Sequence, residues 1–351
     1  MSLLTYKYRI KDSTSRAALC KMAGAINYVW NYCNEVSLLA FRRDKTFLSA
    51  YDLHKLTAGT SKDLRLSADT LQQVCTEYVT RRKQFKKIKL KWRSKKRSLG
   101  WIPFKAAYIK LQDDTVTYCG HRFRLWLSRP VEGTVKTGSF TQDARGRWYV
   151  SLQCEVTDAT EPVGQAEIGI DLGLVNQITC SDGMIYNREN LTRTHEAALA
   201  LAQRAGKKKR VKALHAKIQN VRADWTHKAT TAIARRGKLI VIGDVSSAKL
   251  IKTPFAKSML DASWHAIRHQ LTYKAIRLAG VCVPGPESFS SVTCSDCGTR
   301  CGPSGLRALG VREWVCSSCG ALHNRDVNAA RNILHTPRTG RGTPTKGIRL
   351  L

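Results

Sequence analysis

The chain is poor in acidic residues and has no long apolar run. Of its 351 residues only 26 are Asp or Glu, whereas 59 are Lys or Arg, so the formal net charge is +33. This excess argues against a small-molecule enzyme with a balanced surface and predicts a polyanionic partner, either nucleic acid or an anionic membrane. No apolar run approaches the ~18 residues of a membrane-spanning helix, and the N-terminal MSLLTYKYRI lacks the pattern of a signal peptide. We therefore expect nucleic acid as the partner and no membrane.

The chain does contain enough apolar sequence for a packed core, and many cysteines. Its hydrophobic content is 43%, and its length suggests two or three domains. Seven of the twelve cysteines are scattered, which is typical of buried thiols in a reducing cytosol. Four others form two Cys-x2-Cys pairs, and this spacing predicts one closed, structural Zn²⁺ site. The predicted ligands are Cys294, Cys297, Cys316 and Cys319, with Cys301 as a spare that we expect not to ligate.

The first half of the chain alternates between strand and helix patterns. Residues 1–11 alternate apolar and basic side chains, which predicts a strand. Apolar residues at steps of three and four predict a helix over 15–42, and 48–90 is mostly helical with a break near 58–61. Short strand patterns separated by turn residues over 100–156 predict a small β-barrel, which the first strand joins.

A third region begins near residue 163. It contains the strand EIGIDLG, a long basic helix pair over 195–235, and KLIVIGDV, whose β-branched run indicates a buried parallel strand. A helix over about 259–279 precedes the short strand GVCVPGPE, and another helix covers 325–334. The last residues, 336–351, have no periodicity and predict a disordered tail.

Two basic clusters are candidates for nucleic-acid contact. The run 81–97 holds eleven Lys or Arg with aromatic residues between them. Because so many positive charges in a short segment repel one another, a bound phosphate backbone is a better explanation of the run than a solvated face. The second cluster, 207–210, is either a contact or a solvated turn. Trp92 and Trp101 can stack on bases, although core packing is the expected fate of each. The candidate contacts are Lys86, Lys87, Lys91, Trp92, Arg93, Lys95, Lys96, Lys207, Lys208, Lys209 and Arg210.

Among so few acids, an acid on an apolar strand is a candidate site residue. Asp171 follows a run that places its isoleucines on the opposite face, and Gly169 and Gly173 flank it. We expect these glycines to clear space for a substrate backbone or an ion, rather than Asp171 being a turn residue. Asp326 begins the helix after the second cysteine pair, where a helix N-terminal charge is the simpler interpretation.

The order of these motifs resembles that of the TnpB (OrfB-type) transposon-encoded nucleases, relatives of the type V CRISPR effectors. YKYRIK near the N-terminus and WRSKKRSLGWIPF (92–104) are also similar to that family, so the resemblance covers nearly the whole chain except the tail. The most specific matches are GIDLG (169–173), LIVIGDV (239–245), SSVTCSDCG (290–298), VCSSCG (315–320) and HNRDVNAARNIL (323–334).

The resemblance implies a multi-domain α+β protein. It would combine an RNase H-like RuvC α/β nuclease domain, carrying an inserted four-Cys zinc ribbon, with an N-terminal wedge-like β-barrel that carries a helical insertion. The implied boundaries are 1–14 and 98–160 for the barrel, 15–97 for the helical insertion, 161–293 and 320–335 for the RuvC-like domain, 294–319 for the ribbon and 336–351 for the basic tail.

The resemblance also implies an RNA-guided DNA endonuclease. Such a protein binds a transposon-derived guide RNA and cuts double-stranded target DNA beside a short flanking motif. Asp171 matches the first RuvC aspartate and Asp326 that of the third motif. Carboxylates suit two Mg²⁺ ions, which about 4 Å apart stabilise the attacking and leaving oxygens of phosphodiester hydrolysis. We expect a monomer or a dimer on one RNA, in the prokaryotic cytoplasm and associated with the nucleoid.

The second RuvC motif departs from the family pattern. Gly243 stands where family members usually carry a catalytic Glu, and glycine cannot bind a metal. Asp244 would point to the opposite face of a regular strand. Glu287 ends the next predicted strand, so its carboxylate can reach the gap from the neighbouring strand end, and we prefer it as the third Mg²⁺ ligand. Asp224 is a lesser candidate for this ligand, and we expect it to be a helix-surface residue.

Three hypotheses follow. The leading one is an RNA-guided, Mg²⁺-dependent endonuclease with a rearranged third acid. The alternative is a nuclease-inactive, RNA-guided DNA-binding protein such as a repressor, which Gly243 motivates. The third is a transposase that transfers strands without a guide RNA.

Overall fold

The computed structural model describes residues 1–188, 191–244, 263–305, 308 and 310–335. The chain forms two compact units, Met1–Thr157 and Asp158–Leu351, and each is described by itself. The predicted tail, 336–351, and the start of the helix predicted over 259–279 lie outside the described residues.

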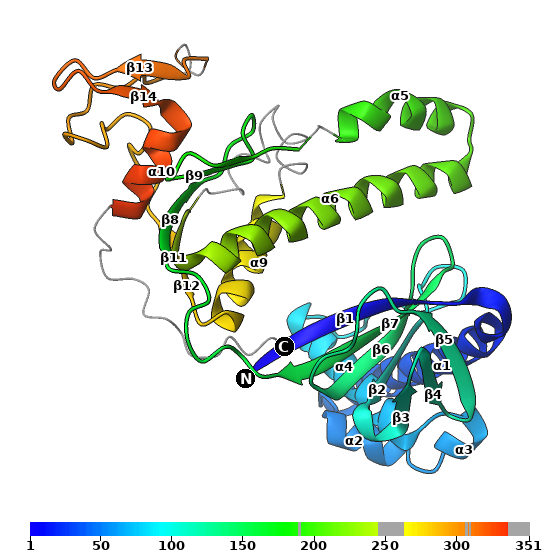
Figure 1. Ribbon diagram of the computed structural model, residues 1–351. Helices are drawn as coiled ribbons and strands as arrows, with labels where there is room; N and C mark the ends of the chain where they lie inside the picture. Colours follow the sequence, from blue (N-terminus) through cyan, green and yellow to red (C-terminus); the bar gives the residue numbers. More distant parts are fainter. Residues whose placement is uncertain (189–190, 245–262, 306–307, 309, 336–351) are drawn as a thin grey trace. The chain divides into compact units, whose positions relative to one another are not determined.

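The first unit is built on a seven-stranded antiparallel sheet in the order β2-β6-β7-β1-β5-β4-β3 (Figure 1). The N-terminal strand lies in its middle and pairs with β7 and β5, which follow the helical region in sequence. A 3-10 turn, η1 (Ala106–Tyr108), joins β2 to β3. The strands are β1 (Ser2–Ile10), β2 (Trp101–Lys105), β3 (Ile109–Gln112), β4 (Thr115–Tyr118), β5 (His121–Trp126), β6 (Thr134–Gln142) and β7 (Trp148–Val156).

This sheet curves into a nearly closed, barrel-like shape. Phe104 of β2 and Tyr118 of β4 belong to opposite ends of the strand order, yet their ring centroids are 5.9 Å apart. Phe140 of β6 lies 5.0 Å from the first ring and 5.6 Å from the second. These fully buried aromatic side chains fill the concave face, as the interior of a small barrel requires. The predicted barrel is therefore present as a barrel-like sheet.

The helices of the first unit all lie between β1 and β2 in sequence. They are α1 (Asp12–Asp44), α2 (Ala50–Leu56), α3 (Ser61–Leu64) and α4 (Ala68–Gln84). Their apolar faces join the core of the sheet through residues such as Ile26, Leu53 and Tyr78. The helical pattern predicted up to residue 90 ends at Gln84, because Lys86 adopts a left-handed conformation with φ of 50°. Most of the basic run 81–97 is therefore not helical.

The second unit contains a five-stranded sheet in the order β10-β9-β8-β11-β12 (Figure 1). Strands β8, β11 and β12 are parallel neighbours, and β9 runs antiparallel to β8. Strands β9 and β10 form an antiparallel hairpin, with Gly183 at φ of 88° in its turn. The strands are β8 (Ala166–Asp171), β9 (Ile178–Cys180), β10 (Ile185–Tyr186), β11 (Gly237–Gly243) and β12 (Val281–Gly285).

Helices cover both faces of this sheet. On one face, isoleucines of β8 and β11 pack against α6 (Lys208–Arg236) and α9 (Trp264–Arg277) through Ile233, Ile267 and Leu271. The opposite face is covered by α10 (Arg325–His335), the helix that begins with the candidate Asp326. A further helix, α5 (Leu191–Arg204), packs on α6. None of the described helices has the length and apolar content that crossing a membrane requires.

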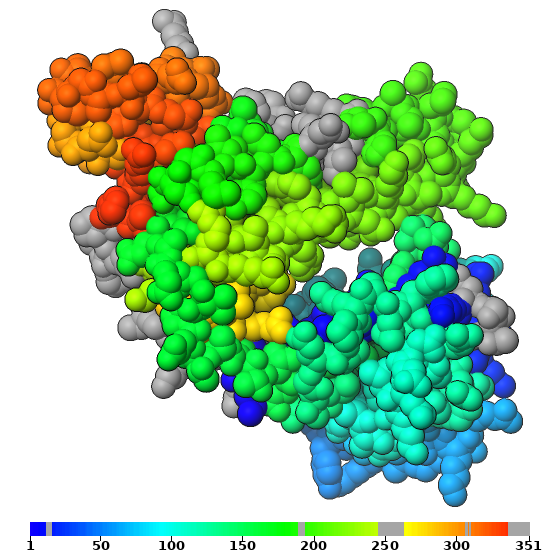
Figure 2. Space-filling view, in the orientation of Figure 1, coloured from blue at the N-terminus to red at the C-terminus, as the bar shows by residue number. Residues whose placement is uncertain are grey.

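A small cysteine-rich lobe precedes α10. Its regular structure is an antiparallel hairpin of β13 (Glu313–Val315) and β14 (Leu322–Asn324). Trp314 and His323 are opposite one another in this hairpin, with ring centroids 4.7 Å apart, and both are buried. In the space-filling view these orange residues form one lobe on the red helix α10 (Figure 2).

Candidate functional site

Three parallel strands of the second unit end at the same level. Ile242 of β11 is the partner of Ile170 in β8, and Gly243 is the partner of Gly285 in β12. Asp171 follows Ile170 and Gly243 follows Ile242, so these two residues lie side by side on the face opposite to the isoleucines. The carboxyl ends of parallel strands are the usual place for sites in α/β sheets.

Helix α10 brings Asp326 to this edge of the sheet. A Cβ atom on Gly169 would lie 2.0 Å from the carbonyl oxygen of Ala330, so the glycine allows the helix to pack directly on β8. A Cβ on Gly173 would lie 2.5 Å from the carbonyl oxygen of Asn176, within a turn. The space beside Asp171 that we expected for a substrate or ion is therefore used by the protein's own backbone at both glycines.

Glu287 reaches the place where a side chain on Gly243 would lie. A Cβ atom at position 243 would be 2.1 Å from Oε1 of Glu287 and 2.9 Å from two of its side-chain carbons. The Glu287 carboxylate thus lies in the space left by the missing side chain, two residues beyond the end of β12. Its Oε1 is buried and has no hydrogen-bond partner among the described residues.

The carboxylates at this edge repel one another. Burial and the nearby Asp326 raise the pKa of Asp171 to about 7. Burial and the nearby Asp171 raise the pKa of Glu287 to about 7 as well. Arg312 and Arg325 oppose the first shift and Arg268 the second. Negative charge is therefore concentrated and desolvated here, which is the electrostatic condition that a bound cation relieves.

The other two candidate acids at this edge already have arginine partners. Nη1 of Arg312, from the cysteine-rich lobe, lies 3.1 and 3.3 Å from the two carboxylate oxygens of Asp326, and Asn176 donates to the same carboxylate at 2.7 Å. Asp244 lies on the face opposite to Gly243, is mostly exposed, and pairs with Arg268 at 3.3 Å. Asp224 is exposed on α6 and pairs with Lys228 at 2.7 Å, as its helix-surface interpretation predicted.

The donor set at this edge fits Mg²⁺. Its groups are carboxylate oxygens, the ligands that hard divalent cations prefer. Oε1 of Glu287 is buried without a hydrogen-bond partner among the described residues, and burial together with Asp326 raises the pKa of Asp171, so a bound cation would stabilise the charged form of both carboxylates. Among the described residues, the four cysteines are the group of candidate metal ligands whose atoms all lie within 4.8 Å of one another.

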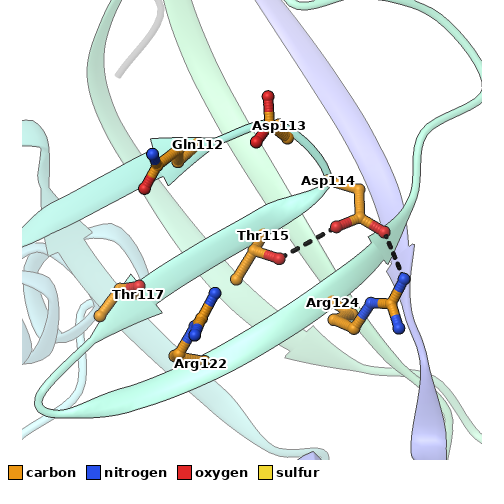
Figure 3. Close-up of a pocket in the computed structure, with 7 residues that line it drawn as sticks. All are labelled: Gln112, Asp113, Asp114, Thr115, Thr117, Arg122 and Arg124. Atoms are coloured by element: carbon orange, nitrogen blue, oxygen red, sulfur yellow. Dashed lines mark hydrogen bonds and ion pairs between the residues drawn. The ribbon is translucent and has the colours of Figure 1, made fainter.

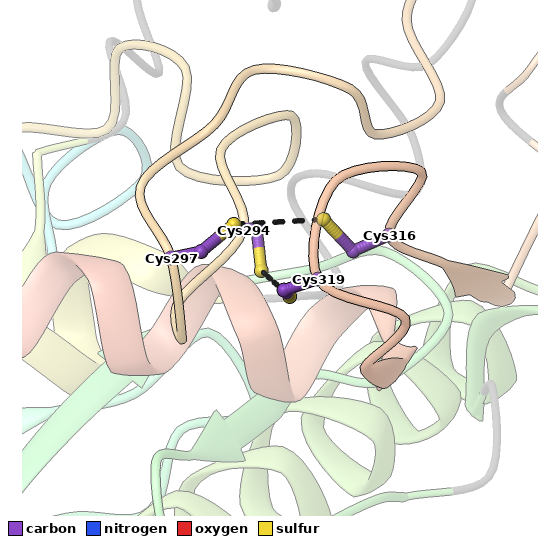
Figure 4. A group of neighbouring side chains, drawn as sticks. All are labelled: Cys294, Cys297, Cys316 and Cys319. Carbon is purple, nitrogen blue, oxygen red and sulfur yellow. Dashed lines mark hydrogen bonds between the residues drawn. The ribbon is translucent and has the colours of Figure 1, made fainter.

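The cysteine-rich lobe gathers the four predicted zinc ligands (Figure 4). The Sγ atoms of Cys294 and Cys319 are 3.7 Å apart, and those of Cys297 and Cys316 are 3.6 Å apart. A tetrahedral Zn²⁺ with Zn–S bonds of about 2.3 Å places its sulfurs about 3.8 Å apart. The geometry and chemistry of this cluster therefore fit zinc.

One residue beside the cluster, His323, was missed by the sequence interpretation. His323 is buried, and its Nε2 lies 3.0 Å from Sγ of Cys294. A ring nitrogen in that position can donate to a thiolate and orient it. The expected spare, Cys301, stands outside the four-sulfur group, although its Sγ is 3.3 Å from that of Cys316. The sequence identified Cys301 because it lies among the other cysteines, whereas nothing in the cysteine spacing pointed to His323.

The cysteine-rich lobe is bonded directly to the helix that carries Asp326. Asn328 is buried in α10, donates to the carbonyls of Ser290 and Thr293, and accepts from the backbone N–H of Ser295 at 2.8 Å. Asn332 donates to the same two carbonyls. Both asparagines come from the motif in which only Asp326 had been assigned a role. The fold of the first cysteine pair therefore sets the position of α10.

This coupling predicts that zinc loss disturbs more than the lobe itself. We expect Cys316→Ser to lower the zinc content from one ion per chain to none, and to lower the thermal stability of the chain, because the metal supplies folding free energy. Cys301→Ser, the matched control, should keep one zinc. The measurements are metal analysis by mass spectrometry and thermal unfolding; zinc loss in Cys301→Ser would contradict the four-cysteine assignment.

The basic candidates separate into outward and inward side chains. Nearly all are exposed, and Trp92 is 53% exposed, so core packing is not its fate. Trp101 packs half-buried against the core of the first unit. Arg93 differs from its neighbours, because its guanidinium donates to Asn27 and to the carbonyl of Leu99 within the protein. The exposed candidates are Lys86, Lys87, Lys91, Trp92, Lys95, Lys96, Lys207, Lys208, Lys209 and Arg210.

A polar pocket also lies on strands β3 to β5 of the first unit (Figure 3). Its walls carry both signs of charge, and Asp114 pairs with Lys11 at 3.1 Å and with Arg124 at 3.3 Å. One of its two acids, Asp114, is therefore already engaged by bases. The residues that line it are Gln112, Asp113, Asp114, Thr115, Thr117, Arg122 and Arg124.

Two family models match parts of this chain. The model described as "Cas12f1-like, TNB domain" matches residues 264–333, which include α9, the cysteine-rich lobe and most of α10. The model described as "Probable transposase", of the OrfB IS605 type, matches residues 151–253. Together the two matches cover most of the second unit, including Asp171, Gly243, Glu287 and Asp326.

Curated relatives extend the likeness to the whole chain. A protein of Streptomyces pristinaespiralis, named "Putative RNA-guided DNA endonuclease", is 30% identical over 94% of this chain and 88% of its own length. A protein of Escherichia coli K12 with the same description, InsQ, is 31% identical over 59% of this chain and 58% of its own length. Cas12f1 of Sulfoacidibacillus thermotolerans is 25% identical over 54% of this chain and 50% of its own. The chain belongs to the TnpB family, to which the Cas12f1 nucleases are similar.

Solved structures add little to this. A Cas12f1–sgRNA–target DNA complex matches 96% of this chain and 100% of its own, with 16% identity and a TM-score of 0.38. At that TM-score the superposition carries no argument of its own.

Proposed function

We propose that this protein is an RNA-guided DNA endonuclease of transposon origin, which cuts DNA by Mg²⁺-dependent hydrolysis in a RuvC-like domain. Its membership of the TnpB family supports the activity, since relatives are named RNA-guided DNA endonucleases. The five-stranded sheet, with an antiparallel hairpin on one side and parallel strands on the other, supports the RNase H-like assignment. Guide RNA and double-stranded target DNA are its proposed partners, and the exposed lysines its proposed contacts.

The observation that carries this proposal is the position of Glu287. Its carboxylate lies where the side chain of a second-motif Glu would lie if residue 243 had one, since a Cβ there would be 2.1 Å from its Oε1. The site therefore keeps three acids, Asp171, Glu287 and Asp326, although the motif that normally supplies one of them holds glycine. Asp244 is mostly exposed and is paired with Arg268.

The acids of this edge and their neighbours have distinct roles in the proposed hydrolysis. Bound at this edge, two Mg²⁺ ions would supply the charge that stabilises the attacking and leaving oxygens of a phosphodiester. Asp171 and Glu287 provide desolvated carboxylates from the ends of β8 and β12, the two strands that flank β11, and a rigid sheet holds them at a constant separation. Asn176 orients Asp326 through its 2.7 Å hydrogen bond. Zinc, held by the four cysteines, would have a structural role only.

The competing function is RNA-guided DNA binding without cleavage. It remains the alternative because Gly243 removes the usual second-motif ligand. The deciding experiment co-expresses the chain with its flanking genomic sequence, purifies the bound RNA, and incubates the complex with a matched plasmid and Mg²⁺. Cleavage that needs both the RNA and Mg²⁺ supports the nuclease; target binding without any cleavage would refute it in favour of the alternative.

Arg312 predicts a specific effect on the Mg²⁺ requirement. Its guanidinium lies within 3.3 Å of both Asp326 oxygens, so a cation that binds Asp326 must compete with it. Replacing Arg312 by Gln should tighten Mg²⁺ binding by roughly fivefold to tenfold, the worth of a partly exposed charge-assisted hydrogen bond. The measurement is a Mg²⁺ titration of the RNA complex by calorimetry. Weaker binding in Arg312→Gln would show that the arginine assists the ion rather than competing with it.

A further inference from the structure

The basic segment, residues 85–98, follows helix α4 and runs without helix or strand along α1. Helix α1 presents three asparagines to it, Asn27, Asn31 and Asn34, at steps of four and three that place them on one face. Asn34 is fully buried and Asn27 nearly so. Buried amides require hydrogen-bond partners, and here the basic segment provides them. We call these three residues the asparagine ladder.

Two side-chain amides of the asparagine ladder each bond both the carbonyl and the N–H of one residue in the basic segment. Asn31 donates to the carbonyl of Arg93 and accepts from its N–H, both at 2.8 Å. Asn34 makes the same pair of bonds to Leu90, at 2.8 and 2.9 Å. The backbone is therefore held at two residues three apart. Asn27 accepts from Nε of Arg93 at 2.8 Å, which adds a side-chain contact at the same place.

Arg93 belongs to the scaffold of the segment. Besides Asn27, its guanidinium donates to the carbonyl of Leu99 at 2.8 Å and lies 5.6 Å from the ring centroid of Trp30. Burial lowers its pKa. The Arg93 guanidinium is therefore bonded within the protein, where it closes the turn at the end of the segment, and it is not available to an external phosphate. This distinguishes Arg93 from the lysines on either side of it.

The bonds from the asparagine ladder leave the remaining cations pointing outward. Lys89 pairs with Glu35 at 3.5 Å and lies 5.6 Å from the ring of Trp92. Within the part of the chain that the structure describes, five other exposed lysines of the segment have no acidic partner. They are Lys86, Lys87, Lys91, Lys95 and Lys96. Ordering like charges without counter-charges costs electrostatic free energy, which a bound phosphodiester backbone returns.

We propose that the asparagine ladder preorders the basic segment as a track for a phosphodiester backbone, with Trp92 as a stacking position for an unpaired base. Asn27, Asn31, Asn34 and Arg93 are then positioning residues, and the lysines make the contacts. Preordering raises affinity because less conformational freedom is lost on binding. The inference rests on the proposed function for its ligand, since the same backbone chemistry is offered by a guide RNA or by single-stranded DNA.

The test separates positioning from charge by the salt dependence of binding. Asn31→Ala keeps every cation, so the plot of log Kd against log salt concentration should keep its slope while affinity falls about tenfold, equivalent to one or two side chains left to be ordered on binding. Lys91→Ala should instead reduce the slope by about 0.7, the value for one phosphate contact on a single strand. The probes are oligouridylate and oligothymidylate of equal length, and the arm that responds identifies the nucleic acid.

Two controls make the result decisive. Hydrogen exchange should show the amides of Leu90 and Arg93 protected in the wild type, and in Asn31→Ala the Arg93 amide, which Asn31 accepts from, should become exposed. Val74→Ala, fully buried in α4 away from the segment's hydrogen bonds, controls for general destabilisation. If Asn34→Ala fails to fold, the half-buried Asn31 and the double variant Asn27→Ala/Arg93→Ala still test the proposal.

Three outcomes would overturn the inference. They are persistent amide protection in Asn31→Ala, unchanged affinity for both probes despite lost protection, and an affinity loss no larger than in Val74→Ala. Failure of the proposed function would look different: the wild-type complex would not cut a matched plasmid, whereas the exchange and salt measurements on the free chain would keep their meaning.

Discussion

Glu287→Ala should lower the rate of target cleavage by about 10³-fold while leaving guide RNA and target binding unchanged. The carboxylate is one of three acids at the ends of β8 and β12 and the start of α10, and loss of one metal ligand removes several kcal/mol of transition-state stabilisation. Its buried Oε1 has no partner in the described residues, so few other bonds are lost with it. The measurement is a single-turnover plasmid cleavage assay at saturating Mg²⁺, with binding measured separately by gel shift.

Two other acids serve as matched controls for this variant. Asp244→Ala removes an acid one residue from Gly243 that is paired with Arg268 on the other face, and should change the rate less than about fivefold. Asp224→Ala removes an exposed acid of α6 and should have no effect. If Glu287→Ala cuts as fast as the wild type, the rearranged site is wrong; a large loss in Asp244→Ala would transfer the role to that residue.

Gly243→Ala should abolish most cleavage, although it adds only one methyl group. The new Cβ would lie 2.1 Å from Oε1 and 2.9 Å from Cδ of Glu287, distances at which the carboxylate must move. A displaced metal ligand costs almost as much as an absent one, so we expect a loss of about 10²-fold or more in single-turnover rate. Target binding should be unchanged because the basic contacts are untouched.

The matched control and the rescue both follow from the same geometry. Gly24→Ala makes the identical change in α1, where a Cβ meets nothing within 4 Å, and should leave cleavage intact. The double variant Gly243→Glu/Glu287→Ala moves the acid back to β11 and should recover at least about tenfold over Glu287→Ala, since the space that the Glu287 carboxylate vacates begins at the Cβ of residue 243. No recovery, together with full activity of Gly243→Ala, would show that this place is not a metal site.

Local patterns were sufficient to predict much of the second unit. The alternation in EIGIDLG, the β-branched run of β11 and the apolar spacing after Asp326 each specify an element because one face of each must be buried. The four cysteines were predicted by spacing alone, since a tetrahedral site restricts its ligands to two tight turns. Glu287 was placed near Gly243 from the neighbourhood of two parallel strands, and that pairing is present.

Other features depended on contacts between segments that are distant in sequence. The roles of Gly169 and Gly173 were misread, because nothing local shows that α10 and a turn approach them closely. The helix predicted to continue to residue 90 stops at Gln84, since Asn31 and Asn34, more than fifty residues earlier, bond the backbone of the basic segment instead.

The sequence by itself was enough to predict the charge of the partner, the four clustered cysteines, the family and the candidate acids, because charge, spacing and motif order are properties of the chain. Only the tertiary structure decided which residues work together. Whether Glu287 or Asp244 fills the gap at Gly243 depends on which face of the sheet each side chain leaves, and whether Arg93 contacts a phosphate depends on Asn27. Distances between side chains arise from packing, which a linear pattern does not contain.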